Sequence, residues 1–236
     1  MWGVLGKAIM TAGQNEAARV NKDIWERLYR SGNYLQYPSE QLVRLFCRHV
    51  RGRIPEGALV IDHGAGSGNN AEFFVREGCQ VLVTDISEEA LEIIGRRFFH
   101  LHLPVPRRHL VQPGDNAIDS LPQCDVMVFW DVLNYNSADN ARAMLRAGIG
   151  RLRPGGFLLV NMPTPRHHFI ANAREIAPGT FEFKGEDQQG AIMCTPGSTE
   201  RLAEWCAGVV PVEVGGFSHH TMQRCSEFMY LVGRKG

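Results

Sequence analysis

A glycine-rich loop between an apolar strand and a helix is the feature that most restricts the fold of this chain. Residues 58–62 form a short, continuous apolar run that ends in an acid, and Gly64, Gly66 and Gly68 follow at alternate positions. A helix is expected next, over residues 70–77. A loop of this kind lets the backbone approach a ligand closely and directs the amino end of a helix toward it. By itself the loop predicts a ligand site of the nucleotide-binding type.

Apolar strands alternate with amphipathic helices through the middle of the chain, which is typical of a parallel sheet covered on both faces. Two later apolar runs are joined by a link without a helical pattern, and they predict an antiparallel pair at one edge. The fold class is therefore α/β, a Rossmann-like doubly wound sheet, mostly parallel with an antiparallel C-terminal edge hairpin. The expected strands are 58–62, 80–85, 110–111, 125–130, 157–160, 209–214 and 227–232, and the expected helices between them include 70–77, one opened by Ser87, and 138–152.

The 236 residues suit one α/β domain with a substantial core. Residues 1–50 are expected to form an N-terminal helical arm or lid, with a loose start, a helix over 21–30, and a second helix capped by Ser39. Residues 51–236 are expected to form the binding domain. Within it, residues 162–196 carry Pro, Gly and polar residues where a helix is due, which indicates an insertion on the substrate side.

Composition excludes several classes of function. Lys plus Arg and Asp plus Glu both total 25, so no overall field attracts polyanions and no nucleic-acid partner is expected. No apolar run approaches the about 20 residues of a membrane span, and the start of the chain lacks the pattern of a secretory leader. A cytoplasmic location and no membrane association are therefore expected. The six cysteines are scattered without a C-x-x-C pair, which favours reduced structural thiols and no metal.

The glycine register and two acids narrow the ligand. In the dinucleotide fingerprint the third glycine would fall at Asn69 or Ala71, so that fingerprint is absent. Asp62 directly before the loop would repel a pyrophosphate but suits an ammonium group. Asp85 ends the next strand, where an acid accepts hydrogen bonds from both ribose hydroxyls. The pattern describes a ligand with a ribose and a cationic end but no phosphate.

With these residues the chain resembles the class I methyltransferases that depend on S-adenosylmethionine (SAM). The resemblance spans roughly residues 25–235, and His63 departs from it because the family usually carries an apolar residue there. Five motifs carry it in order: Asp62–Gly68, Asp85, Gly114-Asp115-Asn116 with Leu121-Pro122, the strand Asp125–Trp130 ending at Asp131, and Arg151–Gly156. It implies SAM as cofactor and S-adenosylhomocysteine as product. The implied cofactor-binding residues are Asp62, Gly64, Ala65, Gly66, Gly68, Asn70, Asp85, Ile86, Asp115, Asn116, Asp131 and Val132.

Several of these residues also have a simpler structural interpretation. Asp85 is also compatible with a helix-start acid, Asp115 with a turn residue, and Asp131 with a plain strand end. Asn69 and Asn70 are suited to cap the helix that follows the loop.

The methyl acceptor is less constrained, because an in-line displacement at a sulfonium needs alignment and desolvation rather than one obligatory catalytic motif. Asp131-Val132-Leu133-Asn134-Tyr135 is not the Asn/Asp-Pro-Pro-Tyr motif of enzymes that methylate amide or DNA-base amino groups. We expect transfer to O or N of a small-molecule acceptor, of sugar or secondary-metabolite type. The alternatives are a methylator of protein or rRNA, and a non-catalytic scaffold module with this fold. The sequence does not indicate the oligomeric state.

Candidate acceptor-side residues come from three segments. Trp25, Tyr29, Tyr34 and Tyr37 belong to the arm or lid, although helix-to-sheet packing is an alternative for Trp25, and Asn134 and Tyr135 follow the fourth strand. His167 and His168, just after the fifth strand, are candidate general bases because an imidazole titrates near neutral pH. The alternative is a surface or capping role, which applies also to His219 and His220. His63, His167 and His168 have no metal-ligand spacing, so no metal is expected.

Overall fold

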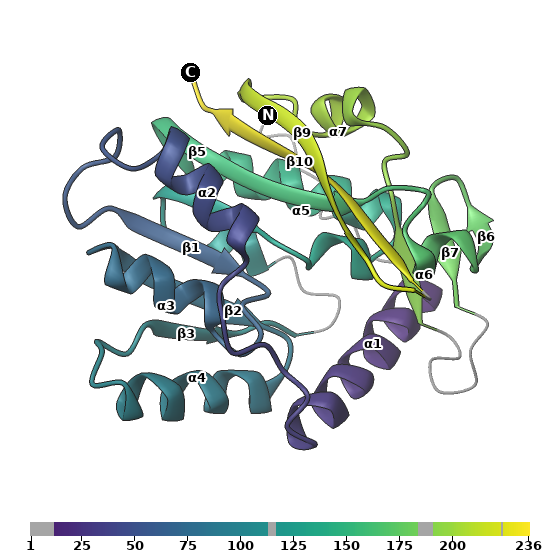
Figure 1. Cartoon of the computed structure of the whole chain (residues 1–236), viewed down its shortest axis with the longest axis horizontal. Coiled ribbons are helices and arrows are strands. Elements are labelled where there is room, and N and C mark those ends of the chain that lie inside the picture. The colour runs from purple at the N-terminus through teal and green to yellow at the C-terminus, as the bar shows by residue number, and fades with distance from the viewer. Residues whose placement is uncertain (1–11, 113–116, 184–190, 223) are drawn as a thin grey trace, which may run out of the picture.

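The computed structural model describes residues 12–112, 117–183, 191–222 and 224–236, with side chains from residue 19 onward (Figure 1). Its main sheet has seven strands in the order β3-β2-β1-β4-β5-β10-β9. The first five are parallel, β10 is antiparallel to both of its neighbours, and β9 forms the edge. The predicted Rossmann-like sheet with an antiparallel C-terminal pair is therefore confirmed. The strands are β1 (Leu59–His63), β2 (Gln80–Asp85), β3 (Arg107–Leu110), β4 (Cys124–Phe129), β5 (Leu152–Pro163), β9 (Val210–His220) and β10 (Cys225–Arg234).

Helices cover both faces of this sheet. On one face α2 (Glu40–His49), α3 (Asn69–Arg76) and α4 (Glu88–His100) bury Phe46, Phe74 and Phe98 against the strands. On the other face α5 (Ala138–Arg151) and α7 (Thr199–Trp205) bury Leu145 and Leu202. Every residue of β1 and β4 is buried, because a strand between two helical layers has no solvent-facing side.

Serine caps set the start of the covering helices. The hydroxyl of Ser39 accepts a hydrogen bond from the Leu42 amide, and that of Ser87 accepts one from the Ala90 amide, as predicted. Ser198 caps α7 in the same way. Helix α7 was not expected from the sequence, because its seven residues are too few to show a helical period.

Helix α1 (Ala12–Arg30) lies across the edge at which the parallel strands end (Figure 1). It begins earlier than the expected helix over residues 21–30. Hydrogen bonds at two of its residues help attach it to the rest of the chain. The Asn21 amide donates to the carbonyl oxygen of Tyr135 at 2.7 Å, and the carboxylate of Glu26 accepts from the Glu88 amide at the start of α4 at 2.8 Å.

The segment expected as an insertion folds mainly as a small antiparallel sheet with the order β6-β7-β8. It follows the short helix α6 (His168–Ala171) and comprises β6 (Arg174–Ala177), β7 (Thr180–Glu182) and β8 (Ile192–Cys194). The sheet packs beside the turn η2 (Leu133–Tyr135) that follows β4. The Cys194 thiol contacts the Leu133 carbonyl at 3.5 Å, and the Thr180 hydroxyl accepts from the Ala138 amide. A second short turn, η1 (Ala117–Ser120), precedes β4.

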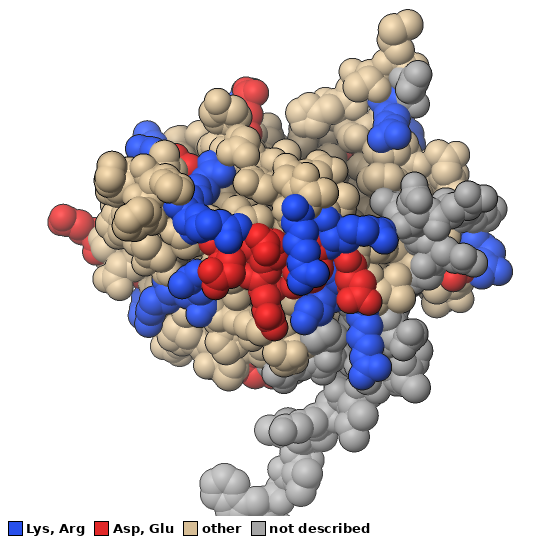
Figure 2. Space-filling view, turned by 90° about the horizontal axis from the view of Figure 1, so that it is seen from below, with Lys and Arg blue, Asp and Glu red and all other residues tan. Residues whose placement is uncertain are grey.

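Charges of both signs intermix on the side of the molecule formed by α4 and α1 (Figure 2). Glu89 pairs with Arg96 at 2.7 Å, and Glu26 pairs with Arg30 at 3.6 Å. This face therefore presents no basic patch, in keeping with the balanced composition. An open hollow of about 600 Å³ on this face is lined by Lys22, Asp23, Glu26, Arg27, Arg30, Ser31 and Glu88.

Candidate functional site

The glycine loop after β1 requires glycine for two physical reasons. Gly64, Gly66 and Gly68 have φ angles of 71°, 55° and 76°, in the left-handed region that other L-residues rarely adopt. Space is also lacking, because a Cβ on Gly64 would stand 2.2 Å from a methyl carbon of Val132. The loop therefore lies directly against Val132, three residues beyond the end of β4.

Asp85, the last residue of β2, holds this loop in place. One of its carboxylate oxygens accepts from the Gly66 amide and the other from the Ser87 amide, both at 2.9 Å. Burial raises the pKa of the Asp85 carboxyl group from its ordinary 3.8 to about 6, and the backbone hydrogen bonds, including one from Ile86, oppose that rise. A carboxylate offers about four acceptor positions, so Asp85 retains capacity for hydroxyl donors.

Asp62, the acid directly before the loop, is buried with one carboxylate oxygen unsatisfied. The residue is 2% exposed, and its Oδ2 atom has no hydrogen-bond partner among the described residues. Burial, and then the charge of nearby Asp85, raise the pKa of Asp62 to about 7. A buried carboxylate without a partner is costly, and a cation beside it would remove that cost.

His63, the departure from the family pattern, has a packing role. Its Nδ1 atom lies 2.6 Å from the Thr84 hydroxyl, and its ring meets Phe129 edge-on at 5.4 Å. Burial lowers the pKa of His63 to about 4, so the ring is neutral at physiological pH. His63 therefore packs in the interior as one member of a small polar pair with Thr84.

Three of the predicted acceptor-side residues, two from α1 and one from the turn after β4, come together beside the loop. Trp25 stacks on Tyr29 at a centroid distance of 5.7 Å and meets Tyr135 edge-on at 4.9 Å. The Tyr29 hydroxyl lies 2.9 Å from where a Cβ on Gly66 would stand, so α1 faces the loop at close range. Burial raises the pKa of both tyrosines well above the ordinary value, and the phenols stay neutral.

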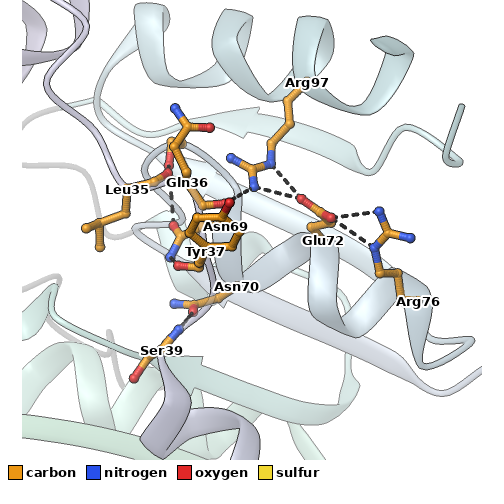
Figure 3. Close-up of polar contacts among 10 residues, drawn as sticks. Leu35, Gln36, Tyr37, Ser39, Asn69, Asn70, Glu72, Arg76 and Arg97 are labelled. Atoms are coloured by element: carbon orange, nitrogen blue, oxygen red, sulfur yellow. Dashed lines mark hydrogen bonds and ion pairs between the residues drawn. The ribbon is translucent and has the colours of Figure 1, made fainter. Parts of the chain in front are cut away.

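The linker between α1 and α2 is tied to the loop and to α3 (Figure 3). The Ser67 hydroxyl donates to the Leu35 carbonyl at 2.6 Å, the Asn69 amide donates to the Tyr37 carbonyl at 2.9 Å, and the Asn70 side-chain oxygen accepts from the Ser39 amide at 3.0 Å. Neither asparagine caps α3, whose N-cap is Gly68 without a side-chain bond. Their side chains hold the linker.

Tyr34 and Tyr37 are not brought to Trp25 by this arrangement. The Tyr37 side chain is 84% exposed, and its ordered contact is through the backbone carbonyl. Tyr34 is half-buried. Of the aromatic residues predicted for the lid, the structure therefore clusters those on α1 rather than those in the linker.

Asp131 follows β4 in an unusual conformation that sequence reasoning did not anticipate. Its φ angle is 55°, although it is not a glycine. Asn161 at the end of β5 holds it twice: the Asn161 oxygen accepts from the Asp131 amide at 2.7 Å, and the Asn161 amide donates to Asp131 Oδ1 at 2.6 Å. The sequence does not predict this role of Asn161. The one pattern that could have indicated it is a single amide residue directly after the apolar run 157–160.

Asn134 and Tyr135 form the turn η2 beside Asp131. Asn134 is buried, and its side-chain oxygen has no hydrogen-bond partner among the described residues. The charge of Asp131 contributes to the raised pKa of Tyr135, so the two side chains are close. Asp115 and Asn116, which the resemblance implies for the cofactor, lie outside the described residues.

His167 and His168 lie at the start of α6. The Nδ1 atom of His167 accepts from the Phe169 amide at 3.3 Å, and its ring packs edge-on against Phe228 at 4.9 Å. Burial lowers the pKa of His167 to about 4. The ring of His168 lies 3.2 Å from the Cys225 carbonyl. These contacts fit the capping alternative, and a catalytic role for either ring stays a prediction.

A search of protein families matches residues 32–209 to a methyltransferase domain. One curated relative is the ubiquinone biosynthesis O-methyltransferase of Xanthomonas axonopodis pv. citri, 29% identical over 159 residues. That alignment covers 63% of this chain and 65% of the relative, slightly less than two thirds of the relative's length.

Solved structures show the same fold. The 1,6-didemethyltoxoflavin-N1-methyltransferase of Burkholderia thailandensis, solved with 1,6-didemethyltoxoflavin and S-adenosylhomocysteine, gives a TM-score of 0.66 at 18% identity, covering 98% of this chain and 93% of its own. A SAM-dependent methyltransferase from Anabaena variabilis also gives 0.66, at 11% identity, covering 93% and 95%. These matches confirm the resemblance stated from the sequence.

Metal-ligand clusters and membrane-spanning helices are both absent from the described part of the chain. Within those residues, no group of three or more His, Cys, Asp or Glu side chains is arranged to hold a metal ion. None of the helices in that part of the chain is both long and apolar enough to cross a membrane.

Proposed function

The chain belongs to the methyltransferase domain family, and on this premise we propose that it transfers a methyl group from SAM to an oxygen or nitrogen atom of a small molecule. The observation that carries the donor assignment is the pair of buried acids at the glycine loop. Asp85 clamps the loop and keeps acceptor capacity, while Asp62 is buried with an oxygen that has no partner among the described residues. A cationic, ribose-bearing, phosphate-free ligand meets both requirements.

The residues at the loop divide the recognition of SAM between them. Asp62 would attract the ammonium group of its methionine part, either directly or through water. Asp85 would accept hydrogen bonds from the ribose hydroxyls. Gly64 and Gly66 keep the backbone free of side chains on this side. When bound, SAM supplies a methyl group activated by its sulfonium.

Helix α1 would cover the bound donor. Trp25 and Tyr29 face the loop, and Asn21 and Glu26 attach the helix to Tyr135 and to the start of α4. Excluding water from this edge strengthens the electrostatic interactions there and prevents hydrolysis of the donor. Release of these contacts would open the site for exchange of SAM and S-adenosylhomocysteine.

A small-molecule acceptor is supported by the named relatives and by the surface charge. The Xanthomonas relative is an O-methyltransferase of ubiquinone biosynthesis, and the Burkholderia neighbour is an N1-methyltransferase solved with 1,6-didemethyltoxoflavin. The face of mixed charge shown in Figure 2 lacks the continuous basic stripe that an RNA partner would need on that side. A sugar or secondary metabolite remains the proposed acceptor type.

Calorimetry with SAM and S-adenosylhomocysteine tests the donor assignment. Both ligands should bind the purified protein in the micromolar range. Asp85→Ala should weaken both by about 2–3 kcal/mol, as expected when a charge-assisted contact is lost. Asp139→Ala, at an exposed acid on α5, is the matched control and should leave the affinities unchanged. Absence of binding by both ligands would refute the proposal.

Tritiated SAM then separates the acceptor classes. After incubation of the protein with a cell extract, label in the low-molecular-weight fraction supports the small-molecule assignment. Label retained with protein or RNA would replace it by a macromolecular acceptor. Tight SAM binding with no transfer to any fraction would indicate a scaffold module instead.

A further inference from the structure

Asp131 occupies a strained backbone conformation that its neighbours enforce. A φ of 55° is uncommon for a residue other than glycine, and it persists where the surroundings hold it. Asn161 holds Asp131 in this conformation, because its buried side-chain amide binds both the backbone N–H and the carboxylate of Asp131. Such strain is concentrated at functional sites. The pair therefore calls for a chemical explanation beyond folding.

The geometry leaves one oxygen of Asp131 available. The Asn161 amide occupies Oδ1, and within the described residues no hydrogen bond reaches Oδ2. Asp131 is accessible to solvent, so an acceptor can reach it, and the burial of the carboxyl group among its neighbours raises its pKa against the opposing hydrogen bond from Asn161. An oriented carboxylate with a raised pKa is a stronger base than an ordinary surface acid.

Two titratable groups face Asp131 from neighbouring elements. Tyr135 lies on the turn η2 and stays neutral. His219 lies on β9, and its charge, when present, lowers the pKa of Asp131. On the loop side, Val132, the next residue in the chain, packs against Gly64. Asp131 is therefore one residue from a contact with the proposed donor loop.

Aromatic rings gather at this end of the sheet, on the residue that precedes Asp131 and on β9 and β10. We call Trp130, Phe217 and Phe228 the aromatic shelf. Trp130 and Phe217 are parallel within 6° at a centroid distance of 6.1 Å, and Phe217 and Phe228 are within 17° at 5.1 Å. His219, which acts on Asp131, meets Phe217 edge-on at 5.7 Å. Phe217 and Phe228 are only partly buried, and the buried Trp130 indole N–H has no partner among the described residues.

Resting on the proposed function, we propose that the acceptor is an uncharged aromatic ring with a hydroxyl or ring N–H, that it packs on the aromatic shelf, and that Asp131 accepts its proton. In the transfer, the acceptor O or N forms a bond to the methyl carbon while the carbon–sulfur bond breaks and its electron pair stays on sulfur. The acceptor proton moves to Asp131 Oδ2 and later to water. Asn161 is a positioning residue, since it acts through Asp131.

The charge of Asp131 determines which acceptors the site binds. An acceptor that presents a carboxylate would place two negative charges together and would be rejected. An ether of the same shape carries no proton for Asp131 and would leave its oxygen unpaired. The acceptor side should therefore distinguish three rings that differ in a single substituent.

Phenol, anisole and benzoate are the matched probes, measured by calorimetry or NMR with the protein saturated by S-adenosylhomocysteine. Phenol should bind about tenfold more tightly than anisole, which corresponds to one charge-assisted hydrogen bond. Benzoate should bind most weakly. Equal affinities for phenol and anisole, a preference for benzoate, or no binding by any probe would overturn the proposal.

Asp131→Asn is the informative variant, because asparagine tolerates a left-handed φ better than other residues and keeps the shape. It should abolish the preference for phenol over anisole while S-adenosylhomocysteine still binds. If the variant loses S-adenosylhomocysteine instead, Asp131 serves the donor and the inference fails. If the wild-type protein does not bind S-adenosylhomocysteine at all, the proposed function fails first, and the two failures are distinguishable.

A titration of Asp131 by carbon-13 NMR tests Asn161 without any acceptor. The wild-type carboxyl group should titrate above the ordinary 3.8. Asn161→Ala should raise this pKa further, because the donated hydrogen bond that favours the charged form is lost. Phe217→Ala should weaken phenol and anisole together, because both rings lose the same packing surface. An Asp131 pKa that does not respond to Asn161→Ala contradicts the positioning role.

Discussion

Replacing Asp62 with Asn should stabilise the ligand-free protein at high pH and weaken its binding of SAM. Folding raises the pKa of Asp62 from 3.8 to about 7. Because the folded state then holds a proton more tightly than the unfolded state, wild-type stability is fully present below about pH 4 and falls as the pH rises toward 7. A shift of this size corresponds to ~4 kcal/mol at 1.36 kcal/mol per pKa unit. The neutral amide lacks this penalty.

The quantity to measure is the difference in the free energy of unfolding between Asp62→Asn and wild type, at two pH values. Packing differences between Asp and Asn are the same at both pH values, so they cancel when the two differences are subtracted. Urea unfolding at about pH 4 and about pH 8 gives the free energy of unfolding of both proteins. The advantage of Asp62→Asn should grow by ~4 kcal/mol between the two pH values. Asp85 titrates in both proteins. Glu56→Gln, at an exposed turn residue, is the control and should show little change.

SAM binding should respond with the opposite sign. At about pH 8 the same substitution should weaken SAM by tenfold or more, because the buried carboxylate no longer meets the ammonium group. If the unfolding difference is the same at both pH values, Asp62 does not carry a buried charge and the reasoning is refuted. If SAM affinity is unaffected, Asp62 does not serve the donor.

Two packing predictions concern the loop and the linker. Gly64→Ala should lower the free energy of unfolding by ~3 kcal/mol, because the new Cβ would meet Val132 and because a φ of 71° suits glycine. Adding Val132→Ala should restore part of this loss. If Gly64→Ala leaves the stability unchanged, the close contact with Val132 is contradicted. Arg97→Ala should cost ~2 kcal/mol, because Arg97 binds Glu72 at 2.7 Å in a mostly buried setting and also holds the linker through the Gln36 carbonyl. Arg76→Ala, whose exposed guanidinium binds the same Glu72, should cost less than about 1 kcal/mol, and equal costs in both variants would count against the linker contact.

The sheet and the glycine loop could be predicted because the sequence patterns that produce them lie within short stretches of the chain. Continuous apolar runs become strands buried on both faces, so β1, β2, β4 and β5 can be recognised from the sequence. Gly64 and Gly66 stand where the chain must turn left-handed, and Asp85 reaches the loop from the adjacent strand. Whether these residues hold SAM stays a prediction until binding is measured.

Short elements and paired side chains were less predictable. α7 and the strands β6 to β8 are too short for a period to appear, so the segment after β5 could be expected only as an insertion. Asn70 is adjacent to the loop in sequence, but its side chain binds the linker instead. An amide in a loop gives no sign of which distant backbone group it will meet.

The proposed donor half and the proposed acceptor half of the site differ in how the chain builds them. The donor half comes from Asp62, the glycine loop and Asp85, which lie within one strand–helix–strand unit, so their proximity follows from local connectivity. The acceptor half joins Trp25, Asp131, Asn161 and Phe217, which come from elements far apart in sequence. They meet at the edge where the parallel strands end. Helix α1 lies across that edge, and β10 pairs with both β5 and β9, so that β9 ends there too (Figure 1). A chain of this fold can therefore keep one donor while substitutions at scattered positions change the acceptor, which is why the acceptor has to be inferred from the three-dimensional structure.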